Sequence, residues 1–182
     1  DTRQANGARI IGQIPRGPLS VLSVDMHVLN EGLLPGEIDA LELIIKRPLP
    51  EALKQFYRRI NGGHFFGGEL SIYGLRRSYG RTIEEAAQPF AMEQSNVEPR
   101  RLRGAPESAV LFAFYQDDGE RLAAFPDRPE IFATPDHRWQ VKRTWPNLET
   151  CLVSEFDRLG RFFDAQGNKI DPDAHCSPIY GL

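Results

Sequence analysis

The segment from Leu49 to Gly63 constrains the fold more than any other part of the chain. Pro50 suits the first turn of a helix, where its missing N–H is not needed. Apolar residues then recur at i, i+3, i+4 and i+7, namely Leu53, Phe56, Tyr57 and Ile60. Asn61, Gly62 and Gly63 follow, and such residues reach the positive φ that ends a helix at little cost. The sequence therefore predicts an amphipathic helix that packs on a core and ends in a sharp turn.

Composition restricts the class of protein. With 182 residues, 41% hydrophobic and 26% charged, the chain suits one globular domain with a real core. The formal net charge of -3 attracts no polyanion, so we expect no nucleic-acid partner. No apolar run approaches the roughly 20 residues that cross a bilayer, and the first residues lack a signal-peptide pattern. Two cysteines make no disulfide framework, so we expect a cytoplasmic protein without a membrane partner.

Further helices and strands are predicted on both sides of this segment. One helix runs from Gly36 to Ile45, a capping box at Thr82 opens a short one, and Asn147 is a good N-cap for the last. The predicted strands are Glu69–Tyr73, Ala109–Tyr115, Arg121–Phe125, Glu130–Ala133 and Gln140–Thr144. Short polar links between strands favour antiparallel neighbours. The order predicts an α+β fold with a mainly antiparallel sheet of about five to six strands packed with helices.

The run from Leu49 to Gly63 resembles the signature of the SUKH superfamily, which is a Leu-Pro pair, an amphipathic helix and Asn-Gly-Gly. That superfamily includes the Smi/Knr family of yeast cell-wall regulators. The likeness continues through Leu70–Gly74 and Val110–Phe114 to a closing helix around Leu152–Phe163. It implies a SUKH-like α+β domain over residues 36–164, with residues 1–35 as an N-terminal extension, irregular or short-stranded, and residues 165–182 as a C-terminal tail.

The resemblance also implies binding rather than catalysis, because the superfamily has no known catalytic residues. Its bacterial members are immunity proteins that bind a toxin delivered by neighbouring cells, so we expect stoichiometric neutralisation of a cognate toxin. One alternative is a regulatory or scaffold protein of the Smi/Knr type, acting in cell-wall synthesis. Another is a hydrolase with an unrecognised site, using Asp117, Asp118 and a histidine brought near by folding.

A partner-binding face is predicted from acidic and aromatic residues. Carboxylates gather around the predicted turn after Tyr115, although Asp-Asp-Gly is also what a hairpin turn requires. If the toxin is a nuclease, these carboxylates would mimic phosphates. Aromatic side chains carry much of the energy in protein contacts, and core packing is their alternative role. The predicted contact residues are Asp117, Asp118, Glu120, Asp127, Phe65 and Phe66.

No cofactor or metal is expected. The histidines lack the close spacing of a zinc site, and the acidic residues beside Cys176 lie in a tail that we expect to be mobile. The glycines from Gly62 to Gly68 follow a helix and precede a strand, the reverse of a phosphate-binding loop, so they predict a turn. Cys151 falls within the last helix and is expected in the core rather than as a nucleophile.

Overall fold

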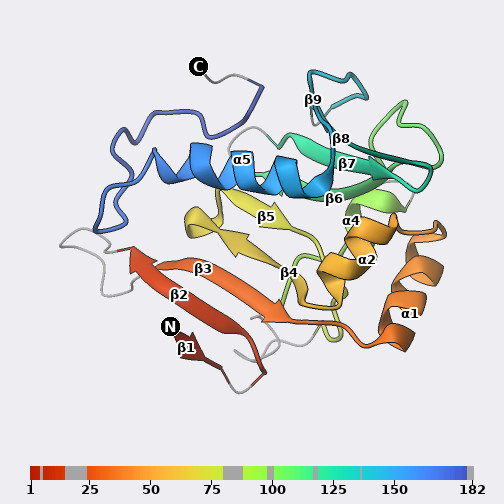
Figure 1. The fold of residues 1–182 in the computed structure, drawn as a ribbon, viewed down its shortest axis with the longest axis horizontal. Coiled ribbons are helices and arrows are strands. Elements are labelled where there is room, and N and C mark those ends of the chain that lie inside the picture. Colours follow the sequence, from red (N-terminus) through yellow and green to blue (C-terminus); the bar gives the residue numbers. More distant parts are fainter. Residues whose placement is uncertain are drawn as a thin grey trace.

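The computed structural model describes residues 1–4, 6–14, 24–79, 88–97, 101–116, 119–135 and 137–179. Its central feature is a nine-stranded sheet whose strands follow sequence order from β1 to β9 (Figure 1). Every neighbouring pair of strands is antiparallel. The α+β prediction with a mainly antiparallel sheet is confirmed.

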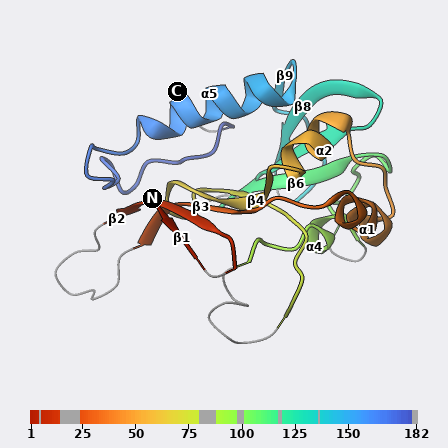
Figure 2. The same cartoon turned by 60° about the horizontal axis from the view of Figure 1, so that its bottom comes forward.

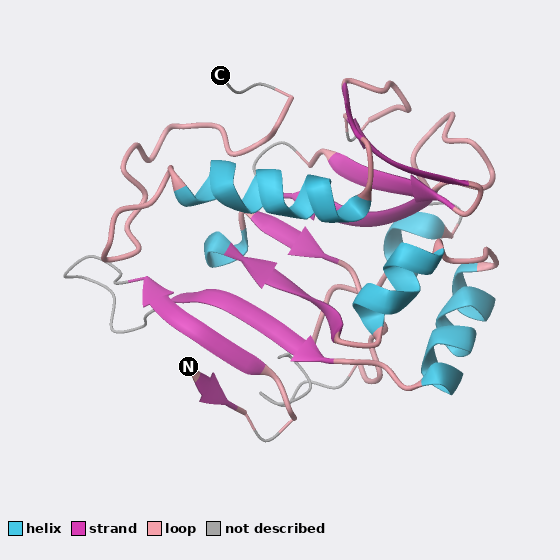
Figure 3. Cartoon of the chain, viewed as in Figure 1, coloured by secondary structure: helices cyan, strands magenta, loops and turns pink. Residues whose placement is uncertain are grey.

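The described residues form long and short strands and four α-helices. Figure 3 distinguishes helices from strands by colour. The strands are β1 (Thr2–Arg3), β2 (Arg9–Ile14), β3 (Val24–Glu31), β4 (Ile60–Phe65), β5 (Leu70–Ile72), β6 (Val110–Tyr115), β7 (Arg121–Phe125), β8 (Arg128–Thr134) and β9 (Arg143–Trp145). The helices are α1 (Pro35–Ile45), α2 (Glu51–Tyr57), α4 (Glu93–Asn96) and α5 (Leu148–Gly160), with one 3-10 turn, η1 (Phe66–Gly68). The helix predicted to open at Thr82 lies outside the described residues.

The sheet is larger than predicted because its N-terminal third comes from residues 1–35. Strands β1, β2 and β3 arise there, and β3 pairs directly with β4, which joins them to the rest of the sheet. The region from 89 to 107, which has the composition of a loop, also contains the short helix α4. Nine strands thus replace the predicted five to six.

The prediction for Asn61, Gly62 and Gly63 was wrong, because these residues lie in strand β4 rather than in a turn. Helix α2 already ends at Tyr57. Gly62 has φ +67°, and a Cβ there would lie 2.5 Å from the carbonyl oxygen of Ile72. A Cβ on Gly63 would lie 2.2 Å from the carbonyl oxygen of a residue in β3. The glycines are therefore required by close approach of neighbouring strands.

Helices cover the two faces of the sheet differently. Figure 2 shows α5 above the sheet and α4 below it. Apolar side chains of α5, among them Leu148, Cys151 and Leu159, join one hydrophobic core with buried residues of the sheet. Leu53 and Tyr57 of α2 enter the same core, each at most 1% exposed. The result is a helical layer, α2 with α5, on one face of the central strands.

Residues 176–178 of the C-terminal tail are buried against the domain, whereas most residues from 164 to 175 are exposed. The expectation of a mobile tail was therefore wrong at Cys176. Cys176 and Ser177 are completely buried. The guanidinium of Arg158 donates a hydrogen bond of 2.6 Å to the carbonyl oxygen of Cys176. The tail begins with a turn near Gly167, whose N–H donates a hydrogen bond of 3.0 Å to the carbonyl oxygen of Asp164.

Candidate functional site

The predicted acidic face is not assembled by the described residues. Asp117 and Asp118 lie outside them. Glu120 is 1% exposed, whereas the Asp127 side chain is 67% exposed and lies beside Arg128. Strand β7 runs between these two carboxylates, and its five residues span about 16 Å. The reason is topological, because successive hairpin turns of a meander lie at opposite ends of the strands.

Phe65 and Phe66 belong to a buried aromatic cluster beneath α5. Their exposed fractions are 3% and 6%. Both rings contact Phe156 of α5 and the imidazole of His27 in β3, with ring centroids 4.8 to 6.1 Å apart. Burial lowers the pKa of His27, which favours the neutral ring that can accept a hydrogen bond from the Phe66 N–H at 3.4 Å. These aromatics therefore hold α5 on the sheet with little of either ring exposed, and Phe65 also lines the hollow described next.

An apolar hollow of about 370 Å³ opens between α2, α5 and the sheet. It is lined by Leu29, Ile60, Phe65 and Ile72 from the sheet, Phe56 from α2, and Leu152, Val153, Phe156 and Asp157 from α5. Eight of these nine residues are apolar, and Val153 is 58% exposed. Exposed apolar surface of this kind marks places where another molecule binds.

Two more hollows adjoin this one along the helices. A hollow of about 510 Å³ at the C-terminal end of α2 shares Phe56 with it and is edged by Arg58 and Arg59. A hollow of about 490 Å³ over the start of α5 shares Leu152 and Val153. We call the three together the α2–α5 groove.

The position of α5, and so of one groove wall, depends on its first turn and on a buried polar cluster. The side chain of Asn147 accepts a hydrogen bond of 2.8 Å from the Thr150 N–H, which caps the helix as predicted. In the middle of α5, the carboxylate of Glu155 accepts hydrogen bonds of 2.6 Å from the Tyr115 hydroxyl and from Arg158. The guanidinium of Arg143 lies 3.8 Å away.

Burial dominates the acid–base properties of this cluster. It is the main cause that holds the pKa of Tyr115 well above its usual range, and the charge of Glu155 acts in the same direction. Burial is the largest single effect on the pKa of Arg158 and opposes its charge. The hydrogen bond to Glu155 and the charges of Glu155 and Tyr115 together outweigh burial and raise the pKa of Arg158. Cys151, next to Glu155 on the helix, is a buried free thiol whose pKa is raised mainly by burial. The cluster therefore consists of a fixed ion pair and a protonated thiol, which suits a structural role.

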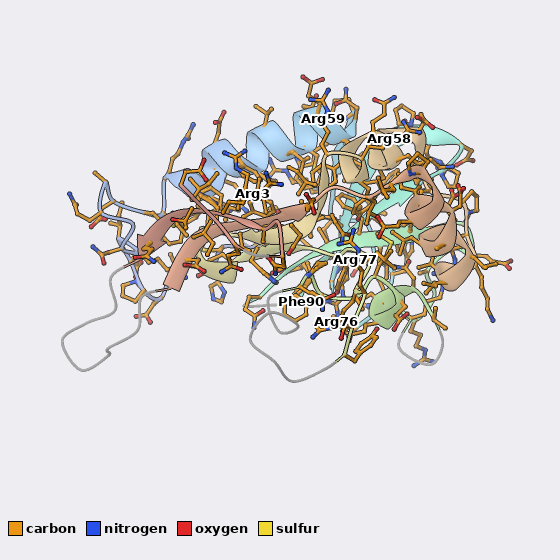
Figure 4. All side chains as sticks on the ribbon, turned by 90° about the horizontal axis from the view of Figure 1, so that it is seen from below. Arg3, Arg58, Arg59, Arg76, Arg77 and Phe90 are labelled. Atoms are coloured by element: carbon orange, nitrogen blue, oxygen red, sulfur yellow. The ribbon has the colours of Figure 1, made fainter. Side chains whose placement is uncertain are left out.

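Charges of both signs edge the groove. Arg58 pairs with Glu51 at 3.3 Å, whereas Arg59 forms no ion pair with any described residue. Figure 4 shows Arg58 and Arg59 on the α5 side of the molecule, with Arg76 and Arg77 nearer the opposite face. On the other rim, Glu149 and Asp157 of α5 are exposed. The groove thus has a basic rim at α2 and an acidic rim along α5.

Sequence reasoning missed the groove residues as a set. Phe56 was assigned to the apolar stripe of its helix, and nothing was inferred from Arg58, Arg59 or Val153. The available signal was Val153, an apolar residue on the polar side of the α5 pattern. Within the described ranges, no group of three or more His, Cys, Asp or Glu side chains is placed to hold a metal ion. No helix among the described residues has the length and apolar character to cross a membrane.

Comparison with known proteins gives a match to a protein family. The family model described as SMI1 / KNR4 family (SUKH-1) matches residues 32–154. No curated protein and no solved structure matches the chain. The matched region begins immediately after β3 and ends within α5, so it includes α2 and most of the groove wall. Strands β1 to β3 lie outside it and extend the sheet at one edge.

Proposed function

The chain belongs to the SMI1/KNR4 family (SUKH-1), and from this premise we propose that it is a non-catalytic binding protein whose α2–α5 groove receives a protein partner. The more specific proposal is an immunity protein that neutralises a cognate bacterial toxin by stoichiometric binding in the cytoplasm. The groove supports a binding role because it offers apolar surface next to exposed charges, the combination found at protein interfaces.

One observation carries this proposal. Val153 is 58% exposed in the middle of a wall whose other apolar members, Leu152 and Phe156, line the same hollow. Val153 is not part of the hydrophobic core, whereas a partner that covers it would remove its apolar surface from water, at about 25 cal/mol per Å². Residues at the centre of such a hollow commonly contribute most of the binding energy.

The test compares two exposed valines. The full chain, its Val153→Asp variant and its Val141→Asp variant are immobilised and exposed to lysates of the source organism and of neighbouring competitor strains. Val141 is 43% exposed and lies before β9, outside the groove, so it is a matched control. Circular dichroism and thermal unfolding establish that both variants are folded.

We expect the wild type and Val141→Asp to retain one toxin domain at a 1:1 ratio and to inhibit it, and Val153→Asp to bind it at least about tenfold more weakly. Equal binding by the two variants would remove the groove from the proposal. Retention of cell-wall proteins without inhibition of any toxin would favour the regulatory role of the Smi/Knr type. Conversion of a retained molecule into a product would favour a hydrolase.

A further inference from the structure

We propose that the α2–α5 groove receives an amphipathic helix of the partner protein. The flank of this helix that faces Arg58 and Arg59 carries acidic side chains. The flank that faces Glu149 and Asp157 carries basic side chains. This inference rests on the proposed function, because it names the chemistry of the partner at the same site.

The backbone of the groove argues for a helix. The floor strands β3, β4 and β5 are each paired with a neighbour on both sides. Helices α2 and α5 use their own backbone groups in helical hydrogen bonds. An extended segment would therefore find no strand edge in the groove and would bury unpaired N–H and C=O groups. A helix satisfies its own backbone and presents only side chains to the apolar floor.

The length of the groove wall fits about two turns of a helix. Exposed or lining residues of α5 run from Glu149 to Asp157, eight helical steps of about 1.5 Å each, or about 12 Å. Apolar anchors at positions i and i+7 of a bound helix are about 10.5 Å apart. An apolar stripe at i, i+3, i+4 and i+7 therefore matches most of the wall from Glu149 to Asp157.

The basic rim is available to a partner. Arg59 is exposed and has no ion pair with a described residue. Arg58 shares a 3.3 Å contact with Glu51, but both side chains are at least half exposed. Such surface pairs contribute little stability, so exchanging Glu51 for a carboxylate of the partner costs little.

The needs of α5 itself explain Glu149 but not Asp157. Glu149 lies in the first turn, where a carboxylate interacts favourably with the helix dipole. Asp157 lies near the C-terminal end, where the dipole disfavours a negative charge, and it forms no ion pair with any described residue. A partner with basic side chains on this flank compensates that charge.

The experiment uses three fluorescein-labelled peptides with one leucine stripe at i, i+3, i+4 and i+7. The first has glutamates on one flank and lysines on the other, the second only glutamates, and the third only lysines. Binding to the full chain is measured by fluorescence anisotropy at about 50 mM and about 300 mM salt, because screening weakens exposed charge contacts.

We expect the two-sign peptide to bind about tenfold more tightly than either one-sign peptide at low salt, with a smaller ratio at high salt. The double variant Arg58→Glu/Arg59→Glu makes both rims acidic, so the all-lysine peptide should then bind most tightly. The matched double variant Arg128→Glu/Arg138→Glu changes the same number of charges outside the groove and should keep the wild-type order. Val153→Asp should weaken all three peptides, and Val141→Asp none.

Three results would overturn the inference. The first is that the three peptides bind with affinities within about twofold of one another. The second is that the Arg58→Glu/Arg59→Glu variant ranks the peptides by affinity in the same order as the wild type. The third is that no peptide binds below about 1 mM although the captured partner binds in a manner sensitive to Val153→Asp. The last result would reject a helical occupant and leave the proposed function standing, whereas insensitivity of the captured partner to Val153→Asp would reject the groove as the site of that function.

Discussion

Replacing Arg158 with methionine tests whether a buried ion pair fixes α5 and the C-terminal tail. Arg158 donates hydrogen bonds of 3.0 and 2.6 Å to one carboxylate oxygen of Glu155 and one of 2.6 Å to the carbonyl of Cys176. Glu155 is 0% exposed. Methionine keeps much of the packing of the arginine stem but removes the charge and all donors. Glu155 then keeps only the Tyr115 hydroxyl and the more distant Arg143.

The structure gives the size of the effect. Removing one partner of a buried ion pair costs about 3–5 kcal/mol, because the other charge stays buried without compensation. The remaining contacts from Tyr115 and Arg143 place the Arg158→Met variant near the lower end, at about 3 kcal/mol. For a chain of this length that lowers Tm by about 6 to 12 °C. Removing both charges, in Glu155→Leu/Arg158→Met, should recover at least about half of the loss.

The assay is urea unfolding followed by circular dichroism, with trypsin digestion to report release of the tail. Lys54→Met is the control, because Lys54 pairs with Glu42 at 2.7 Å while both side chains remain more than 20% exposed. We expect that variant to lose less than about 1 kcal/mol. The reasoning fails if Arg158→Met unfolds within about 0.5 kcal/mol of the wild type, or if the double variant is less stable than the single one.

Three further predictions concern the core. Gly62→Ala should lower the free energy of unfolding by at least about 2 kcal/mol, whereas Gly36→Ala, with open space around it, should be neutral or slightly stabilising. Equal effects in urea unfolding would contradict the close approach of neighbouring strands at Gly62 in β4. Because burial lowers the pKa of His64 from 6.5, the unfolded chain binds more protons, and the folded state should lose stability as pH falls below about 6.5. A His64→Gln variant whose free energy of unfolding depends on acid pH as the wild type's does would refute this. Because burial raises the pKa of the Cys151 thiol, this thiol should resist a thiol-specific reagent in the native protein at about pH 8 and react after unfolding. Reaction at the same rate in both states would count against its burial.

Most local elements follow from short-range patterns. The apolar spacing and the Asn147 cap predicted α5, and short β-branched or aromatic runs between turn residues predicted β6 and β7. The pattern failed at Asn61-Gly62-Gly63, because positive φ serves equally to end a helix and to let strands approach closely. Only the contacts with Val28 and Ile72, distant in sequence, decide between them.

In the candidate site, too, local sequence patterns predicted single elements, and contacts between distant segments decided how they combine. Its lining comes from β3, β4, β5, α2 and α5, and no short window of sequence contains both walls. Of the carboxylates predicted to form an acidic face, the two that the structure describes, Glu120 and Asp127, lie at opposite ends of strand β7. By itself, the sequence determined the α+β class, the family signature and the two helices that border the groove. Only the tertiary structure decided that β1 to β3 extend the sheet, and that apolar and charged side chains from distant segments share one surface. The reason is that packing acts between residues that no local periodicity connects.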